Sequence, residues 1–408
     1  MWFYIKLAWR NIFRNKRRTI IAGLAIGIGL AAMIFSDAFI IGMKNNMIKS
    51  ATGSFLGEAQ IHRQGFRLTQ EVDKTINNLP LVISNLKKEE TVDRFSLRCE
   101  SFGMITSPAN FTSVMVFGID PANEKYLSHI DDVLKEGEFF QGSNERDIVI
   151  GSDLAELLEV NLGDRVVITV AQAGSGDLSQ DMFRISGIYH FNIKEMDRGL
   201  AFIRLTKAQQ MLGLGPGVHE IAIKFKDLNF SLQKDNPFWK KYSKDGNQAV
   251  SWTTLLPQLK IALNMFWVSL LVMAIILFGI VAFGIINTLF MSLYERLFEF
   301  GVLRAVGTRP SGIRRLIIFE AGALSIISIL IGSILGLIIT LIVAKTGIDY
   351  RGIEFAGTTF HELIYPVIHP QQFIIYPAAL FLFTLLTGLY PAIVAGRMSI
   401  TNALRKSM

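Results

Sequence analysis

The sequence predicts an α-helical membrane domain with four transmembrane helices and one large α+β domain outside the membrane. Half of the 408 residues are hydrophobic, which is too large a share for a wholly soluble protein of this size. Four apolar runs are each long enough to cross the ~30 Å hydrocarbon core, which takes about 20 residues. Nearly all of the remaining chain forms one block, residues 44–260, between the first and second runs.

The distribution of basic residues predicts how these runs are oriented across the membrane. The first eighteen residues contain six lysines and arginines and no acid, and residues 294–315 contain five arginines. Because cytoplasmic loops carry an excess of Lys and Arg, we expect both termini and this loop to be cytoplasmic and the large block to lie outside. The net charge of +7 then reflects topology, and no nucleic-acid partner is predicted.

The predicted elements follow in chain order. An amphipathic helix with Trp2, Ile5 and Trp9 on its apolar face is expected at the membrane interface. The full set is a cytoplasmic helix at residues 1–18, transmembrane helices at 19–43, 261–293, 316–343 and 373–395, a cytoplasmic loop at 294–315, an outer loop at 344–372 and a cytoplasmic tail at 396–408.

Glycine pairs with the spacing G-x-x-x-G occur in two of the apolar runs. Gly23 and Gly27 lie in the first, and Gly332 and Gly336 lie in the third. This spacing lets another helix approach closely, so we interpret all four as helix-packing residues.

The outer block mixes predicted strands and helices. Residues 92–105, 113–118 and 219–226 have the β-branched and aromatic content of strands, whereas residues 70–88 and 228–243 have helical spacing. Two α+β lobes would fit, the second inserted at about residues 121–218. The single cysteine, Cys99, cannot form an intrachain disulfide, so this domain must be held by its core.

The loop between the second and third runs carries the most specific pattern. It begins ERLFEFGVLRAVG at Glu295, and Leu297, Phe300 and Arg304 recur on one helical face. Gly307 and Pro310 are expected to end that helix. The simplest interpretation is a solvated basic turn held at the lipid headgroups.

A family resemblance favours another interpretation. The order E-x-G-V-L-R-A-V-G, then Ile313 and Phe319-Glu320, resembles ABC transporter permeases of the MacB/FtsX-like superfamily. The ending P-A-x-x-A-x-R at 391–397, with N-A-L-R at 402–405, also resembles this family. The resemblance implies that the loop is a coupling helix seated in a groove of an ATPase subunit, through Leu297, Phe298, Glu299, Phe300, Gly301, Val302, Leu303, Arg304 and Gly307.

Catalytic motifs are missing from the sequence. No G-x-x-x-x-G-K-[ST] occurs, so the chain itself is not expected to bind ATP phosphates. His361 and His369 are too far apart for H-E-x-x-H, and we predict no catalytic residue, metal or cofactor in this chain. The resemblance implies that ATP and Mg²⁺ are bound by a partner ATPase, present in two copies, and that a second permease chain, identical or paralogous, completes the complex.

Within the superfamily, the sequence is most similar to the lipoprotein-releasing (LolC/LolE-type) permeases, in the run F-R-I-S-G-I-Y-H and the divided outer domain. This implies an inner-membrane protein whose partners are membrane lipoproteins, lipids and a periplasmic carrier. MacB-type export and FtsX-type regulation of an envelope enzyme are the alternatives. Candidate residues for lipid or substrate contact are apolar ones at the outer ends of two runs: Met33, Phe35, Phe39, Ile40, Met43, Leu263, Met265, Phe266 and Trp267.

One acidic residue lies within a predicted span. Glu320 falls about one turn into the third run, where a charge is costly by ~2.5–3.5 kcal/mol. We expect it to face protein and to pair with Arg296, Arg314 or Arg315. The alternative is a side chain that extends to the cytoplasmic headgroups.

Overall fold

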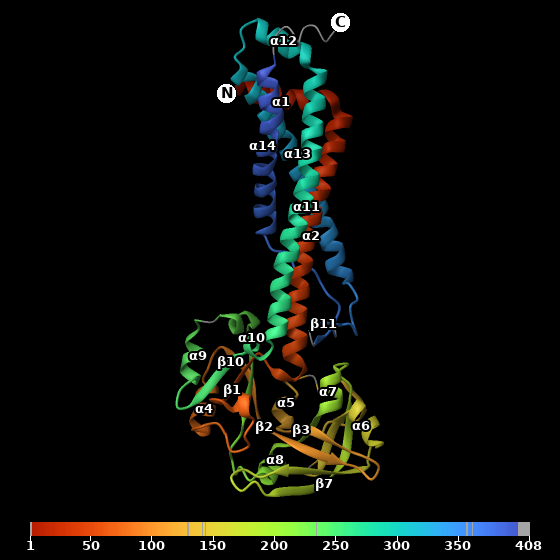
Figure 1. The fold of residues 1–408 in the computed structure, drawn as a ribbon, viewed down its shortest axis with the longest axis vertical. Helices are drawn as coiled ribbons and strands as arrows, with labels where there is room; N and C mark the ends of the chain where they lie inside the picture. Colours follow the sequence, from red (N-terminus) through yellow and green to blue (C-terminus); the bar gives the residue numbers. More distant parts are fainter. Residues whose placement is uncertain are drawn as a thin grey trace. The chain divides into compact units, whose positions relative to one another are not determined.

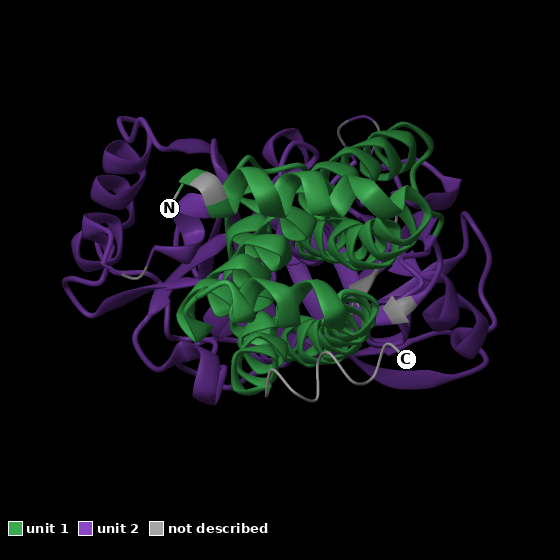
Figure 2. Cartoon of the chain, turned by 90° about the horizontal axis from the view of Figure 1, so that it is seen from above, with its two compact units in different colours: residues 1–45, 263–349, 363–408 green, residues 46–262, 350–362 purple. Residues whose placement is uncertain are grey.

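The computed structural model describes residues 2–128, 130–140, 142, 144–233, 235–355, 358–360 and 362–398. The chain divides into two compact units, which Figure 2 distinguishes by colour. The helical unit comprises Met1–Asn45, Leu263–Asp349 and Leu363–Met408, and the sheet unit comprises Asn46–Ala262 and Tyr350–Glu362.

Long helices make up the helical unit (Figure 1). Within the described part of the chain, four helical segments are long and apolar enough to cross a membrane: Tyr4–Leu56, Pro257–Glu295, Pro310–Thr346 and Gln372–Arg397. The individual elements are α1 (Trp2–Ile12), the 3₁₀ turn η1 (Phe13–Asn15), α2 (Lys16–Ala51), α11 (Pro257–Glu295), α12 (Leu297–Ala305), α13 (Pro310–Thr346) and α14 (Gln372–Arg397).

Helix α13 begins earlier than the apolar pattern indicates. Pro310 occupies its first turn, where the missing backbone N–H has no helical partner to lose. The helix therefore includes residues 310–315, which we had placed in the cytoplasmic loop. What remains between α11 and α13 is α12 and a short turn in which Gly307 has a φ of +102°.

The two glycine pairs meet at the contact between α2 and α13. A Cβ added at Gly332 would lie 2.6 Å from the Gly27 carbonyl oxygen, and one at Gly27 would lie 3.1 Å from the Gly332 nitrogen. A Cβ at Gly336 would approach the Ala31 Cα to 3.2 Å, whereas one at Gly23 meets side chains only at 3.5 Å and beyond. Glycine at positions 27 and 332 thus lets the two backbones touch.

The sheet unit is built on one ten-stranded sheet, in the order β10-β1-β9-β2-β3-β8-β5-β7-β4 with β6 pairing β2 and β7. The strands are β1 (Ala59–Arg63), β2 (Val92–Thr106), β3 (Phe111–Ile119), β4 (Leu134–Gly137), β5 (Asp147–Gly151), β6 (Arg165–Ala171), β7 (Leu178–Tyr189), β8 (Leu200–Arg204), β9 (Glu220–Phe225) and β10 (Asn247–Ser251). Two further short strands, β11 (Glu354–Phe355) and β12 (Thr358–Thr359), pair with each other.

Short helices connect these strands (Figure 1). They are the π-helical turn η2 (Thr52–Leu56), α3 (Phe66–Thr69), α4 (Leu79–Leu86), α5 (Pro121–Glu124), α6 (Ser152–Leu158), α7 (Lys194–Gly199), α8 (Leu205–Leu212), the 3₁₀ turn η3 (Leu228–Leu232), α9 (Pro237–Tyr242) and α10 (Trp252–Leu255).

Hydrogen bonds join β1 to β10 in one sheet, with register shifts in three of the pairings. Strand β3 pairs in parallel with β8, which belongs to residues 121–218, and β2 pairs with β6 from the same segment. The predicted division into two lobes is therefore not confirmed. Two helix predictions were too long. Within residues 70–88, α4 begins only at Leu79. Residues 228–243 form η3 and α9 as separate elements, because Asn236 caps a new helix at Pro237.

The α2–α13 contact leads to a stability prediction. We expect Gly332→Ala to lower the free energy of unfolding by about 1–3 kcal/mol, because the new methyl group overlaps the Gly27 carbonyl and overpacks the contact. Gly23→Ala is the matched control, since its methyl group has room and alanine favours the helix. Thermal unfolding of the purified protein in detergent measures both, and equal stability of the two variants would contradict the prediction.

Candidate coupling site

The inward face of α12 belongs to the chain's own core. Leu297, Phe300 and Gly301 are buried, and the first two pack with Leu293, Ile313 and other residues of the helical unit. We had predicted Leu297 and Phe300 as apolar anchors for a partner. The structure corrects this for both side chains, because a side chain already buried inside the chain has no surface left to present.

The outward face of α12 is apolar and exposed. The side chains of Phe298, Val302 and Leu303 are 50%, 41% and 38% exposed. They lie on the same short helix, with Val306 just after its end, also exposed. Of the residues predicted from the loop motif, these are the apolar ones that a partner could contact.

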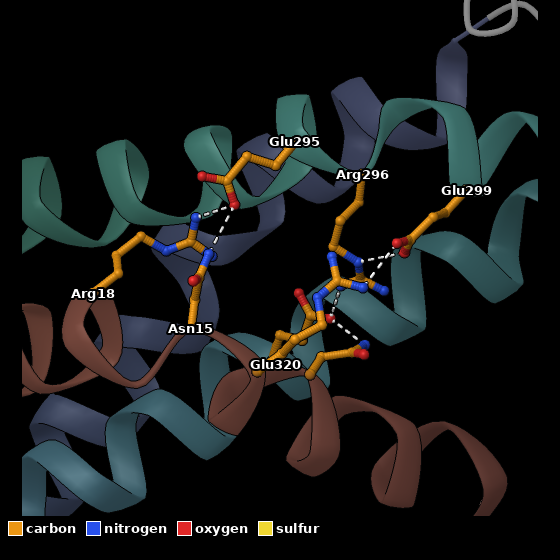
Figure 3. Close-up of polar contacts among 8 residues, drawn as sticks. Asn15, Arg18, Glu295, Arg296, Glu299 and Glu320 are labelled. Carbon is orange, nitrogen blue, oxygen red and sulfur yellow. Dashed lines mark hydrogen bonds and ion pairs between the residues drawn. The ribbon is translucent and has the colours of Figure 1, made fainter. Parts of the chain in front are cut away.

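A buried ion pair fixes the start of α12. Arg296 Nη1 donates to Glu320 Oε1 on α13, and both side chains are about 6% exposed. Arg296 Nε also donates to Glu299 Oε2 at 3.0 Å, and its guanidinium lies over the Phe300 ring, 4.9 Å from the centroid. The expected pairing of Glu320 is therefore with Arg296, not with Arg314 or Arg315, and Figure 3 shows this arrangement.

Polar residues near the N-terminus complete the network (Figure 3). Asn11 Nδ2 on α1 donates to Glu320 Oε1 at 2.7 Å, and Arg14 Nη1 on η1 donates to Glu299 Oε1 at 2.7 Å. Nearby, Arg18 Nη1 and Asn15 Nδ2 donate to Glu295 Oε2 at 2.6 and 3.3 Å. The N-terminal segment thus contacts α11, α12 and α13 through charged groups.

Glu299 and Arg296 are each stabilised in their charged form by neighbours of opposite charge. Partial burial opposes ionisation of Glu299, but hydrogen bonds from Arg14 and Arg296 outweigh it and lower the pKa of this carboxyl. Burial likewise opposes the charge of Arg296, but the carboxylates of Glu320 and Glu299 raise its pKa. Both groups are therefore charged at neutral pH.

A groove of about 920 Å³ lies between α1 and α12. It combines apolar and charged walls, and the exposed face of α12 forms one side. Its lining residues are Leu7, Arg10, Asn11, Phe13, Arg14, Arg296, Phe298, Glu299, Val302 and Leu303.

The remaining residues of the loop motif face the chain itself. Arg304 Nη1 donates to the carbonyl oxygens of Gly396 and Met398 at 3.3 and 3.4 Å, at the end of α14. Gly307 supplies the left-handed backbone that ends α12. The predicted motif at residues 402–405, and His361 of the outer loop, lie outside the described residues.

A second cavity, of about 600 Å³, lies among α2, α11 and α14. Met33 and Trp267 line it, but the other seven residues predicted for lipid contact do not. Phe35 and Phe39 stack on each other instead, with ring centroids 6.2 Å apart. The cavity is mainly apolar, with one carboxylate, Asp37, which accepts a hydrogen bond from Gln372 Nε2 at 2.9 Å.

Sequence reasoning missed the N-terminal half of this site. Asn11, Arg14 and Asn15 are separated from their partners by about 280–310 positions in the chain. The only signal in the sequence was a basic N-terminus, which fits membrane topology equally well.

The buried pair leads to a second stability prediction. We expect Arg296→Ala to destabilise the protein by about 3–5 kcal/mol, since it leaves Glu320 buried with no cation to balance it. Arg18→Ala is the control, because its partly exposed pair with Glu295 is worth no more than about 1 kcal/mol. Denaturant unfolding in detergent micelles compares the two, and a smaller loss for Arg296→Ala than for Arg18→Ala would exclude a structural role for the buried pair.

Two family models match this chain. Residues 19–229 match the MacB-like periplasmic core domain, and residues 271–400 match the FtsX-like permease C-terminal region. In structure, the periplasmic region of MacB from Actinobacillus actinomycetemcomitans is similar at 14% identity, covering 51% of this chain and 94% of that one with a TM-score of 0.34.

Curated relatives carry lipoprotein-release names. LolC of Xylella fastidiosa (strain Temecula1) is 25% identical over 232 residues, and LolE of Haemophilus influenzae is 19% identical over 422 residues. The match spans about half (55%) of each chain for the first and 96% of each for the second. These relatives and the four apolar helices indicate a multi-pass inner-membrane protein. The chain therefore belongs to the MacB/FtsX-like family of ABC transporter permeases.

Proposed function

We propose that this chain is the membrane subunit of an ABC transporter that uses ATP hydrolysis by a separate ATPase to extract lipoproteins from the inner membrane. The observation that carries the proposal is the exposed apolar face of α12, held on a charged network beside a groove of about 920 Å³. The similar proteins LolC and LolE are lipoprotein-releasing system proteins by name, and they suggest the substrate class.

The coupling step uses the exposed side chains of α12. Phe298, Val302 and Leu303 enter a groove of the ATPase, where a few buried apolar residues account for most of the binding energy. Arg296 and Glu299 keep α12 fixed on α13 and η1, so that movement of the ATPase displaces these helices together with α12. ATP and Mg²⁺ are bound by the ATPase, and two permease chains flank two copies of it.

In this proposal the basic loops are cytoplasmic and the sheet unit is periplasmic. The cavity of about 600 Å³ lined by Met33 and Trp267 receives the acyl chains. Extraction exposes apolar surface at ~0.8 kcal/mol per CH₂, so an apolar site within the helices lowers the energy of that step. Methionine suits acyl chains of variable shape because it is flexible and polarizable.

The match to an FtsX-like permease region supports an alternative. In that case the chain transmits force to an envelope enzyme and moves no lipid. Both functions need the coupling helix, and only lipoprotein release needs acyl chains in the cavity.

A charge on the exposed face of α12 tests the coupling step. We expect Leu303→Asp to weaken binding of the ATPase by roughly 30-fold, the effect of losing about 2 kcal/mol at an interface hot spot. Leu68→Asp, at a 93% exposed site on the sheet unit, should leave binding unchanged. Copurification and ATPase stimulation are the measurements, and normal values for a Phe298→Asp, Leu303→Asp double variant would contradict the coupling role.

A photo-crosslinker tests the substrate. Benzoylphenylalanine in place of Trp267 preserves an aromatic ring on the cavity wall, and we expect it to capture lipoprotein before ATP is added and to lose it afterwards. The same probe at Met265, which is exposed and does not line the cavity, should capture phospholipid only. The contrary outcome is capture of phospholipid alone at both positions while Leu303→Asp still weakens binding of the ATPase. That outcome would favour the regulatory function over lipoprotein release.

A further inference from the structure

The cavity of about 600 Å³ among α2, α11 and α14 has a polar end and apolar walls. Along α11 its lining extends from Trp267 to Phe278, which is about 16 Å of helix. This length is about half of the ~30 Å hydrocarbon core, so the cavity is about as deep as one leaflet. The polar lining residues come from α2, from the start of α14 and from the turn before it: Asp37, His369, Gln371, Gln372 and Tyr376.

A buried glutamine fixes the position of Asp37. Gln372 is 3% exposed, and its Oε1 accepts a hydrogen bond from the His369 backbone N–H at 3.1 Å. Its Nε2 therefore serves as the donor to Asp37 Oδ2, at 2.9 Å. The Tyr376 hydroxyl, one turn further along α14, also lies beside this carboxylate. The Asp37 carboxylate is thus held by neutral groups at the polar end of the cavity.

The charge of Asp37 has no balancing cation in the described part of the chain. Asp37 forms no ion pair with a described residue, and no described lysine or arginine lines the cavity. Glu320, the carboxylate within α13, is instead paired with Arg296. An ionised group at membrane depth is costly unless it faces a polar cavity or a partner, and such groups in membrane helices mark binding sites. The cavity therefore suits a ligand with an apolar body and one positive charge.

Asp37 lies at the end of the helical unit opposite to α12. It contacts Gln372, the first residue of α14, whereas Gly396 at the other end of that helix accepts a hydrogen bond from Arg304 of α12. The 26 residues of α14 separate these ends by about 39 Å. In the proposed orientation α12 is cytoplasmic, so Asp37 lies at the periplasmic surface, where the acyl chains of a lipoprotein join its polypeptide.

We propose that Asp37 binds the α-ammonium group of the substrate, so that the transporter selects lipoproteins whose amino terminus is free. This inference rests on the proposed function, because it places the acyl chains and the amino terminus of one lipoprotein in two parts of the same cavity. Chains attached to the side chain of the first residue contact the apolar walls, and the adjoining amine reaches Asp37. An acylated amine carries no charge, so its binding would leave the carboxylate without a cation.

Phosphatidylethanolamine offers the same ammonium group, but the cavity favours the lipoprotein. The phosphate of this lipid would enter the polar end together with its amine and carry a negative charge towards Asp37, which is unfavourable. No described lysine or arginine lines the cavity to bind that phosphate. The amine of a lipoprotein is joined to the acyl chains without a phosphate, so it brings a net positive charge.

Two synthetic lipopeptides that differ only in their amino terminus test this selectivity. Both carry a diacylglyceryl group on the sulfur of an N-terminal cysteine, and the α-amino group is free in one and acetylated in the other. We expect the full-length chain in detergent micelles to bind the free form roughly 10-fold more tightly by fluorescence anisotropy, because a close charge pair contributes at least this factor. Asp37→Asn, whose amide oxygen can still accept the hydrogen bond from Gln372, should bind both forms equally. Asp37→Glu should keep a preference, and so should Asp93→Asn, at an exposed site on β2.

Equal binding of the two lipopeptides by the wild-type chain would overturn the role of Asp37 and leave lipoprotein release unaffected. An undiminished preference in Asp37→Asn, or in the second neutral variant Asp37→Ser if the first does not fold by its Tm, would do the same. Binding of neither lipopeptide would count against the proposed function itself. Capture of phosphatidylethanolamine by the crosslinker at Trp267 would then identify a phospholipid site and reject this proposal as well.

Discussion

The buried ion pair between Arg296 and Glu320 is the constraint on which the helical unit depends. A carboxylate about ten residues inside α13 is costly unless a cation and hydrogen bonds compensate it. Arg296 supplies the cation and Asn11 a further hydrogen bond, which requires α1 and the start of α12 to lie against α13. The orientation of α12, with Leu297 and Phe300 inward and Phe298, Val302 and Leu303 outward, follows from that requirement.

Close packing between α2 and α13 also fixes the position of α13. At Gly27 and Gly332 the backbones of α2 and α13 touch, with no side chain between them that could change rotamer. Apolar helices in lipid gain little from burial alone, so such contacts, together with polar links, hold them together. Helix α13 is therefore fixed to α12 by charge at one end and to α2 by packing further along.

The local elements could be predicted from sequence, but the long-range contacts could not. Apolar run length located the four long helices, and the spacing of glycines identified residues that do meet. The loop motif located α12, but a pattern cannot tell which apolar face a partner covers. The family resemblance therefore assigned both Phe298 and Phe300 to the partner, although only Phe298 is exposed. The sequence predicted that Glu320 pairs with an arginine but left three candidates: Arg296, Arg314 and Arg315. Asn11 and Arg14 were missed because their contacts depend on how α1 folds back over a loop nearly 300 residues away.

Within the described part of the chain, each unit holds a cluster of charged side chains that are wholly or partly buried. In the helical unit, the half-exposed pair of Arg14 with Glu299 adjoins the buried pair of Arg296 with Glu320, so two positive and two negative charges cancel. In the sheet unit, Arg98 contacts both Glu124 and Glu220, and the positive charge of Arg67 also acts on Glu220. Buried charge is tolerated only where opposite charges and hydrogen bonds compensate it. Arginines meet that requirement in both units by joining separate elements: Arg296 links the start of α12 to α13, and Arg98 links β2 to α5 and β9.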